Sequence, residues 1–206
     1  MFTGAVQVEL ANPEHRWPRP DVFTEKDASL ARFLEIYKAL AADQIDFLGF
    51  NPKRMSKLSK YGFVYRWRLR TEVGTLPSAF SLGPVARKYM GVRFLKFSDP
   101  RVVQSLLAVN QLLLFLRRFG GTVDVDPSYP RAVYTLNRPT LILAPRETFY
   151  PEMMKGYPQG IIVLPDPSMA VPGIPVRYCF DSELSPDFVP LYDDALQRAD
   201  LAAAPK

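Results

Sequence analysis

Residues 58–91 read LSKYGFVYRWRLRTEVGTLPSAFSLGPVARKYMG, and a period of two runs through the first part of this stretch. Large apolar side chains alternate there with a set that includes three arginines. The apolar set is Phe63, Tyr65, Trp67 and Leu69, and the other set is Val64, Arg66, Arg68 and Arg70. This alternation predicts a β-strand with one buried and one basic side. Gly74 and Pro77 predict a turn, and residues 79–82 the returning strand of a hairpin.

A helical pattern precedes the hairpin. Residues 24–42, TEKDASLARFLEIYKALAA, place apolar side chains at the spacing of an amphipathic helix, with Thr24 or Asp27 as its N-cap. The segment 43–50 is short and apolar and predicts a turn or a brief helix. Two helical elements therefore precede the most basic part of the chain.

Two further short helices flank the hairpin. Asn51 and Pro52 have the residue types of an N-cap and a first helical turn, and Gly62 lies where a glycine would end the helix. Residues 83–84, Gly-Pro, start another helix after the hairpin. The predicted order is therefore helix, short helix, basic helix, basic hairpin, helix.

Positive charge is concentrated in these elements. Residues 51–101 hold 12 basic and 2 acidic residues, whereas the segments before and after them are net negative. This density stores self-repulsion unless an anionic partner relieves it, and nucleic acid is the commonest such partner. We expect contact with double-stranded DNA from Lys53, Arg54, Lys57, Lys60, Arg66, Arg68 and Arg70. The alternative interpretation is solubilising charge around a small domain.

The aromatic residues of the same strand have two interpretations. Phe63, Tyr65 and Trp67 resemble a stacking platform for single-stranded nucleic acid. Their one-sided alternation favours instead a place in the core of the domain.

The run at 58–91 resembles the recognition-helix end and wing of a winged helix-turn-helix domain. The shared features are a leucine-containing helix, a GFV step at 62–64 and a second wing strand that leads into a Leu-Gly start of the next helix. The resemblance covers about residues 24–93, and the chain is similar to the replication-relaxation family of plasmid and mobile-element proteins. It implies a transcriptional regulator or a plasmid replication and maintenance control protein, with a second domain related to restriction endonucleases.

The C-terminal half predicts one long helix and several strands. SDPRVVQSLLAVNQLLLFLRRFGG, at 98–121, has a capping Ser98 or Asp99, a wide apolar face and two terminal glycines. Five strand candidates follow, at 122–126, 131–137, 140–145, 160–165 and 176–181. Nearly continuous apolar runs such as 140–144 are typical of central strands that are buried on both faces.

The sequence thus predicts an α+β protein with three parts. A flexible arm at 1–22 contains prolines and precedes a winged helix DNA-binding domain at 23–97. A mixed α/β domain at 98–206 serves dimerisation or partner contact. A homodimer is expected because one small winged helix buries little surface on DNA. The helix at 99–119 is a candidate dimer interface, and the alternative is an internal helix that packs on its own sheet.

Enzymatic chemistry has weaker support. A metal-dependent nuclease of the restriction type needs an acid-x-Lys pair, and none follows the strand-end acids Asp124, Asp126, Asp166, Asp181 and Glu183. The one histidine, His15, lies in the proline-rich arm, so no histidine-based triad is expected. We expect no cofactor and no metal. A nuclease or relaxation-type enzyme stays an alternative, as does a protein-interaction module whose basic surface meets an acidic partner.

The composition favours a cytoplasmic protein. Cys179 is the only cysteine, which excludes a disulfide within the chain. The N-terminus lacks the pattern of a signal peptide, and the most apolar run, LLLFL at 112–116, is much shorter than a membrane span. No membrane association is therefore expected.

Overall fold

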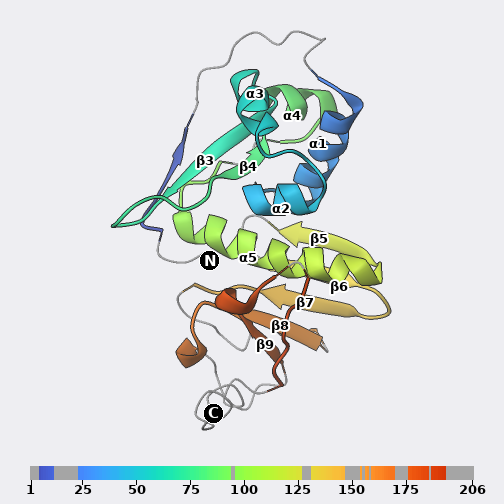
Figure 1. Cartoon of the computed structure of the whole chain (residues 1–206). Helices are drawn as coiled ribbons and strands as arrows, with labels where there is room; N and C mark the ends of the chain where they lie inside the picture. The colour runs from blue at the N-terminus through green and yellow to red at the C-terminus, as the bar shows by residue number, and fades with distance from the viewer. Residues whose placement is uncertain are drawn as a thin grey trace. The chain divides into compact units, whose positions relative to one another are not determined.

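The computed structural model describes residues 5–11, 23–93, 96–126, 131–146, 154, 156–157, 159–169, 176–185 and 187–193. Helices and strands are mixed, and the strands form two separate sheets (Figure 1). The chain divides into two compact units between Val103 and Gln104. The predicted α+β class is confirmed, and the division falls six residues after the predicted boundary at 97.

Helices of the first unit match the predicted bounds in part. The helix predicted at 24–42 ends at Tyr37, and residues 40–41 form a strand instead. The helix predicted to begin at Asn51 and Pro52 begins at Arg54. The described part contains α1 (Glu25–Tyr37), α2 (Ala42–Phe47), α3 (Arg54–Lys60) and α4 (Pro84–Met90). Thr24 is the N-cap of α1: its Oγ1 accepts a hydrogen bond from Asp27 N at 3.3 Å, and the Asp27 carboxylate accepts one from Thr24 N at 2.8 Å. This reciprocal capping box satisfies two backbone donors. Gly62 follows α3 with a φ of +69°, a conformation that favours glycine.

The sheet of the first unit has four antiparallel strands. They are β1 (Gln7–Leu10), β2 (Leu40–Ala41), β3 (Val64–Arg70) and β4 (Ala79–Leu82), in the order β1-β3-β4-β2. The predicted hairpin is confirmed as β3 and β4. The prediction of a flexible arm at 1–22 is wrong for residues 7–10, which pair with the free edge of β3 and extend the sheet.

The apolar side of β3 lies in the core of the first unit. Trp67 is 3% exposed, and its Nε1 donates a hydrogen bond to Ser81 Oγ at 2.8 Å. The Phe97 ring lies edge-on to the indole at 5.1 Å between centroids. Phe63 is also buried, whereas Tyr65 is half-buried. The interpretation of these aromatic residues as core is therefore confirmed for Phe63 and Trp67.

The second unit is built around a five-stranded mixed sheet. Its strands are β5 (Thr122–Asp126), β6 (Arg131–Thr135), β7 (Pro139–Leu143), β8 (Gln159–Leu164) and β9 (Arg177–Phe180), paired in chain order. β5, β6 and β7 are antiparallel, whereas β7, β8 and β9 are parallel. All five predicted strands are present. The apolar run at 140–144 falls on the middle strand, as its composition predicts.

The long helix α5 (Pro100–Leu116) is an internal element. Every residue from 103 to 114 is buried within the single chain. Pro100–Phe119 is long and apolar enough to cross a membrane by length and composition alone, but 67% of its most apolar stretch is buried, as in a core helix. This burial favours the alternative of an internal helix over the predicted dimer interface, and the homodimer stays a prediction.

Short 3₁₀ turns complete the described elements, at Arg117–Phe119, Pro167–Met169 and Asp181–Glu183. After the first of these, Gly120 and Gly121 have φ values of +82° and +89° and end the helical segment, as predicted. The Tyr134 hydroxyl donates to the Gly120 carbonyl oxygen at 2.8 Å and holds this end against β6.

Gly83 is required where β4 passes into α4. A Cβ atom added there would lie 2.3 Å from the Gly62 carbonyl oxygen and 2.8 Å from the Phe63 carbonyl carbon. Both atoms belong to the backbone at the start of β3, so the clash cannot be relieved by a side-chain rotation.

We predict that Gly83→Ala lowers the free energy of unfolding by about 3 kcal/mol, because the strands must separate to admit a methyl group. Urea unfolding measured by tryptophan fluorescence reports on this unit, since both tryptophans, at 17 and 67, lie in the N-terminal half. The control is Gly74→Ala in the hairpin turn, where a Cβ meets nothing within 4 Å. Equal urea midpoints for the two variants would contradict the prediction.

Candidate nucleic-acid interface

Helix α3 presents lysines to solvent. Met55 and Leu58, three residues apart, are buried and fix which side of this short helix faces the core. Lys53, Lys57 and Lys60 are consequently exposed. Among the ion pairs of the described residues, none involves these three lysines. They are the least neutralised of the predicted DNA contacts.

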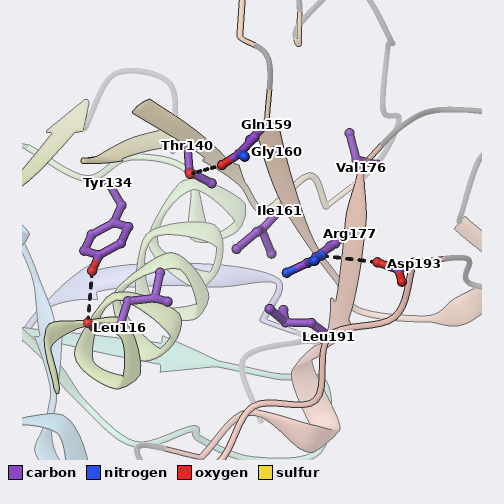
Figure 2. A pocket seen from close by; sticks show the side chains of 10 residues that line it. All are labelled: Leu116, Tyr134, Thr140, Gln159, Gly160, Ile161, Val176, Arg177, Leu191 and Asp193. Carbon is purple, nitrogen blue, oxygen red and sulfur yellow. Dashed lines mark hydrogen bonds and ion pairs between the residues drawn. The ribbon is translucent and has the colours of Figure 1, made fainter. Parts of the chain in front are cut away.

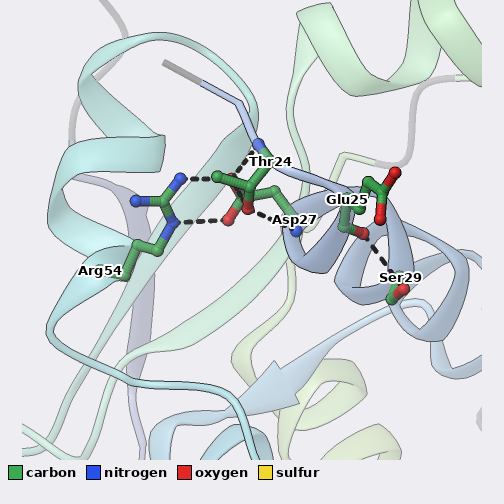
Figure 3. A network of polar contacts seen from close by, with 5 residues as sticks. All are labelled: Thr24, Glu25, Asp27, Ser29 and Arg54. Atoms are coloured by element: carbon green, nitrogen blue, oxygen red, sulfur yellow. Dashed lines mark hydrogen bonds and ion pairs between the residues drawn. The ribbon is translucent and has the colours of Figure 1, made fainter. Parts of the chain in front are cut away.

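Arg54, the first residue of α3, has a different environment. Its Nε donates to Asp27 Oδ1 at 2.6 Å, and its Nη2 donates to Asp27 Oδ2, so the guanidinium and the carboxylate form a two-pronged ion pair (Figure 3). The Asp27 side chain is 3% exposed and the Arg54 side chain 31%. The sequence predicted Arg54 as a DNA contact, whereas the structure places its charge against a buried acid on α1.

The two charges stabilise each other's ionised form. Burial by itself raises the pKa of Asp27, but hydrogen bonds from Arg54 and Thr24 outweigh it and hold that pKa below its usual value. The hydrogen bond to Asp27 likewise raises the pKa of Arg54. Below the depressed pKa of Asp27 the pair would be lost with its stabilisation, so it is intact throughout the neutral range.

Strand β3 carries the other three predicted contacts on its outer side. Arg66 is half-buried, and its Nε donates to Ser78 Oγ at 2.9 Å. Arg68 and Arg70 are exposed, but both face Glu9 of β1, with nitrogen to Glu9 Oε1 distances of 3.6 and 2.8 Å. The β1–β3 pairing sets Glu9 directly opposite Arg68. One carboxylate thus offsets part of the charge of two arginines.

Hydrogen bonding to Arg70 is the main reason that the pKa of Glu9 lies below its usual value. Such exposed pairs exchange readily for other partners because water and salt compete with them. Sequence reasoning missed Glu9 because the nearby prolines directed attention to a flexible arm. The alternation of apolar and polar residues in VQVEL, residues 6–10, was a signal that could have identified the strand.

Further basic residues adjoin the hairpin. Arg87 of α4 lies over the ring of Tyr65, with 5.8 Å between the guanidinium carbon and the ring centroid. Arg87 and Lys88 occupy the last turn of α4, where cations also interact favourably with the helix dipole. Neither residue was among the predicted contacts, although both belong to the basic segment.

The acids that were weighed for catalysis in the second unit have different environments, and two of them, Asp181 and Glu183, share one 3₁₀ turn. Asp124 is exposed on β5, and Asp126 pairs with Arg131 of the adjacent strand at 3.4 Å. Asp181 is buried, and Arg146 Nη1 donates to its Oδ2 at 2.6 Å. No group of three or more His, Cys, Asp or Glu that could hold a metal ion occurs in the part of the chain that the structure describes.

A pocket of about 440 Å³ opens beside β8 and β9 (Figure 2). Its polar side chains contact each other: Arg177 Nε donates to Asp193 Oδ1 at 3.2 Å, and Thr140 Oγ1 donates to Gln159 Oε1 at 3.3 Å. Asp193 is the only acid among its described lining residues. The described lining residues therefore do not include the paired acids that metal-dependent hydrolysis uses.

Cys179 does not supply a nucleophile. It lies on β9 with no exposed surface, and burial raises the pKa of its thiol, so that the reactive thiolate is disfavoured.

Comparisons with protein-family models, with curated proteins and with solved structures found no match to this chain. The similarity to the replication-relaxation family therefore rests on the residues quoted above and stays a prediction.

The Arg146–Asp181 pair yields a test of the second unit. Burial raises the pKa of Asp181, and the neighbouring Arg146 opposes that rise. We predict that Arg146→Met destabilises by about 3 kcal/mol, because it leaves an unpaired carboxylate in the core. The double variant Arg146→Met/Asp181→Leu is expected to recover most of this loss. Urea unfolding followed by circular dichroism measures both variants, and a double variant less stable than the single one would contradict the prediction.

Proposed function

We propose that the first unit is a winged helix-turn-helix domain that binds double-stranded DNA. The element order α1, β2, α2, α3, β3, β4 supports this proposal, as does the pairing of β4 with both β2 and β3. In a domain of this kind α3 enters the major groove, and the β3–β4 hairpin lies against the phosphate backbone.

The observation that carries the proposal is the set of lysines on α3. Lys53, Lys57 and Lys60 are exposed on or next to one two-turn helix, and the described residues provide no acid that pairs with them. A solubilising surface normally mixes charges of both signs. Three like charges held together on a rigid helix are instead typical of a surface that binds a polyanion.

Two alternatives make different predictions. An acidic protein partner would use the same lysines and would compete with DNA for them. A metal-dependent nuclease in the second unit would require acids that the described residues do not bring together. The proposed role as a transcriptional regulator or plasmid replication control protein rests on the sequence resemblance. The proposed homodimer rests on the small surface that one winged helix buries on DNA.

We predict that Lys57→Gln/Lys60→Gln weakens DNA binding about tenfold at about 100 mM salt. The slope of log affinity against log salt concentration is expected to become less steep by about 2, because two phosphate contacts are lost. Fluorescence anisotropy with a mixed pool of short duplexes, over a series of salt concentrations, measures both quantities.

The matched control for these lysines is Arg138→Gln, which removes an exposed charge from the second unit. Its affinity and slope are expected to equal those of the wild type. Failure of the folded wild type to bind DNA at low salt would overturn the proposed function and favour the acidic protein partner.

We predict that Glu9→Gln tightens DNA binding about two- to fivefold, because Arg68 and Arg70 become free to meet phosphates and an exposed ion pair contributes at most about 1 kcal/mol. The same anisotropy titration measures the change. Glu35→Gln is the control, since it removes an acid of the first unit that forms no ion pair among the described residues. Unchanged or weaker binding by Glu9→Gln would contradict the prediction that Arg68 and Arg70 contact DNA.

A further inference from the structure

The Asp27 carboxylate, which joins α1 to α3, accepts hydrogen bonds from both Thr24 and Arg54. Its Oδ2 accepts hydrogen bonds from Thr24 N at 2.8 Å and from Thr24 Oγ1 at 2.9 Å, and the Arg54 fork binds both oxygens (Figure 3). A buried carboxylate with this many donors has a single favourable orientation. The guanidinium that it holds is therefore fixed as well.

Helix α3 depends on such external fixation. It has only seven residues, fewer than the length at which an isolated helix is stable in water. Met55 and Leu58 anchor one side of it in the core. The Arg54 fork anchors its first turn to α1, which lies 27 positions earlier in the chain. The apolar anchors resist lifting of the helix, and the fork resists its rotation.

We propose that Arg54 and Asp27 are positioning residues, which set the orientation of α3 so that its exposed lysines meet DNA, and that Arg54 makes no phosphate contact of its own. This inference rests on the proposed DNA-binding function. If Arg54 turned toward a phosphate, the buried Asp27 carboxylate would lose its charge partner. The exposed lysines have no such tie and are free to contact the backbone.

A purely electrostatic role and a positioning role of Asp27 predict opposite changes in DNA affinity for the Asp27→Asn variant. Asp27→Asn removes a negative charge from the first unit and releases Arg54, so that electrostatics alone predicts tighter DNA binding. Positioning predicts weaker binding, because an amide cannot hold the guanidinium fork and α3 loses its orientation.

The test is an anisotropy titration of Asp27→Asn, Arg54→Gln, Arg54→Lys and the double variant Asp27→Asn/Arg54→Gln on the same duplex pool. Thermal melts select a temperature at which every variant is folded. We expect each single variant to bind about tenfold more weakly, and the double variant to bind no more weakly than the singles. Arg54→Lys is not expected to restore binding, because an ammonium group keeps the charge but lacks the two-pronged geometry.

Two further variants separate positioning from general destabilisation. Glu25→Gln removes an exposed acid from the same turn of α1 and is expected to leave affinity unchanged. Lys57→Gln is expected to lower affinity less in the Asp27→Asn background than in the wild type, because a misoriented helix no longer presents Lys57 to a phosphate.

If Asp27→Asn bound DNA as tightly as the wild type or more tightly, the inference would be overturned and the proposed function would stand. The same would follow if Arg54→Gln changed only the salt dependence, with a slope of log affinity against log salt that is about one unit less steep, as expected for one lost phosphate contact. A folded wild type that binds no duplex at low salt would overturn the proposed function, and this inference with it.

Discussion

The central position of β3 is the constraint on which the first unit depends. The strand is hydrogen-bonded on both edges, to β1 and to β4, so successive side chains must point to opposite faces of the sheet. Because Trp67 and Leu69 are buried on one side, Arg68 and Arg70 are held on the other, about 7 Å apart along the strand. Core packing thus creates the basic outer side of the hairpin and also the repulsion between its arginines. Glu9 offsets that repulsion at the point where β1 joins the sheet.

The seven predicted contact residues differ in how easily each could leave its present partner to bind an anion. Lys53, Lys57 and Lys60 have no acid partner among the described residues. Arg68 and Arg70 share the half-buried carboxylate of Glu9, which a phosphate can replace at little cost, and Arg66 is hydrogen-bonded to Ser78. Arg54 differs from both groups, since the loss of its partner would leave a charge unpaired in the interior. Equal charge in the sequence therefore does not mean equal capacity to bind an anion.

Local sequence patterns were sufficient to predict most helices and strands, because helix periodicity, strand alternation and capping residues each act over a few positions. The five strands of the second sheet and the capped start of α1 at Thr24 were predicted in this way. The contacts that modify the candidate site lie outside such a window: Arg54 and Asp27 are 27 positions apart, and Arg70 and Glu9 are 61 apart. Only the folded chain brings these charges together. Helix α5 was ambiguous for a related reason, since a partner chain and an internal sheet cover an apolar face equally well.

A surface that gathers like charges needs a rigid support, and the first unit provides it from the opposite side. The buried hydrogen bond from Trp67 to Ser81, the edge-on Phe97 ring and the close approach of Gly83 to Gly62 all fix the backbone that carries the basic side chains. The conformational entropy of ordering that backbone is lost on folding and not on binding. The anionic partner that we propose would relieve the mutual repulsion of these side chains, so the electrostatic strain of the free protein would become a driving force for association.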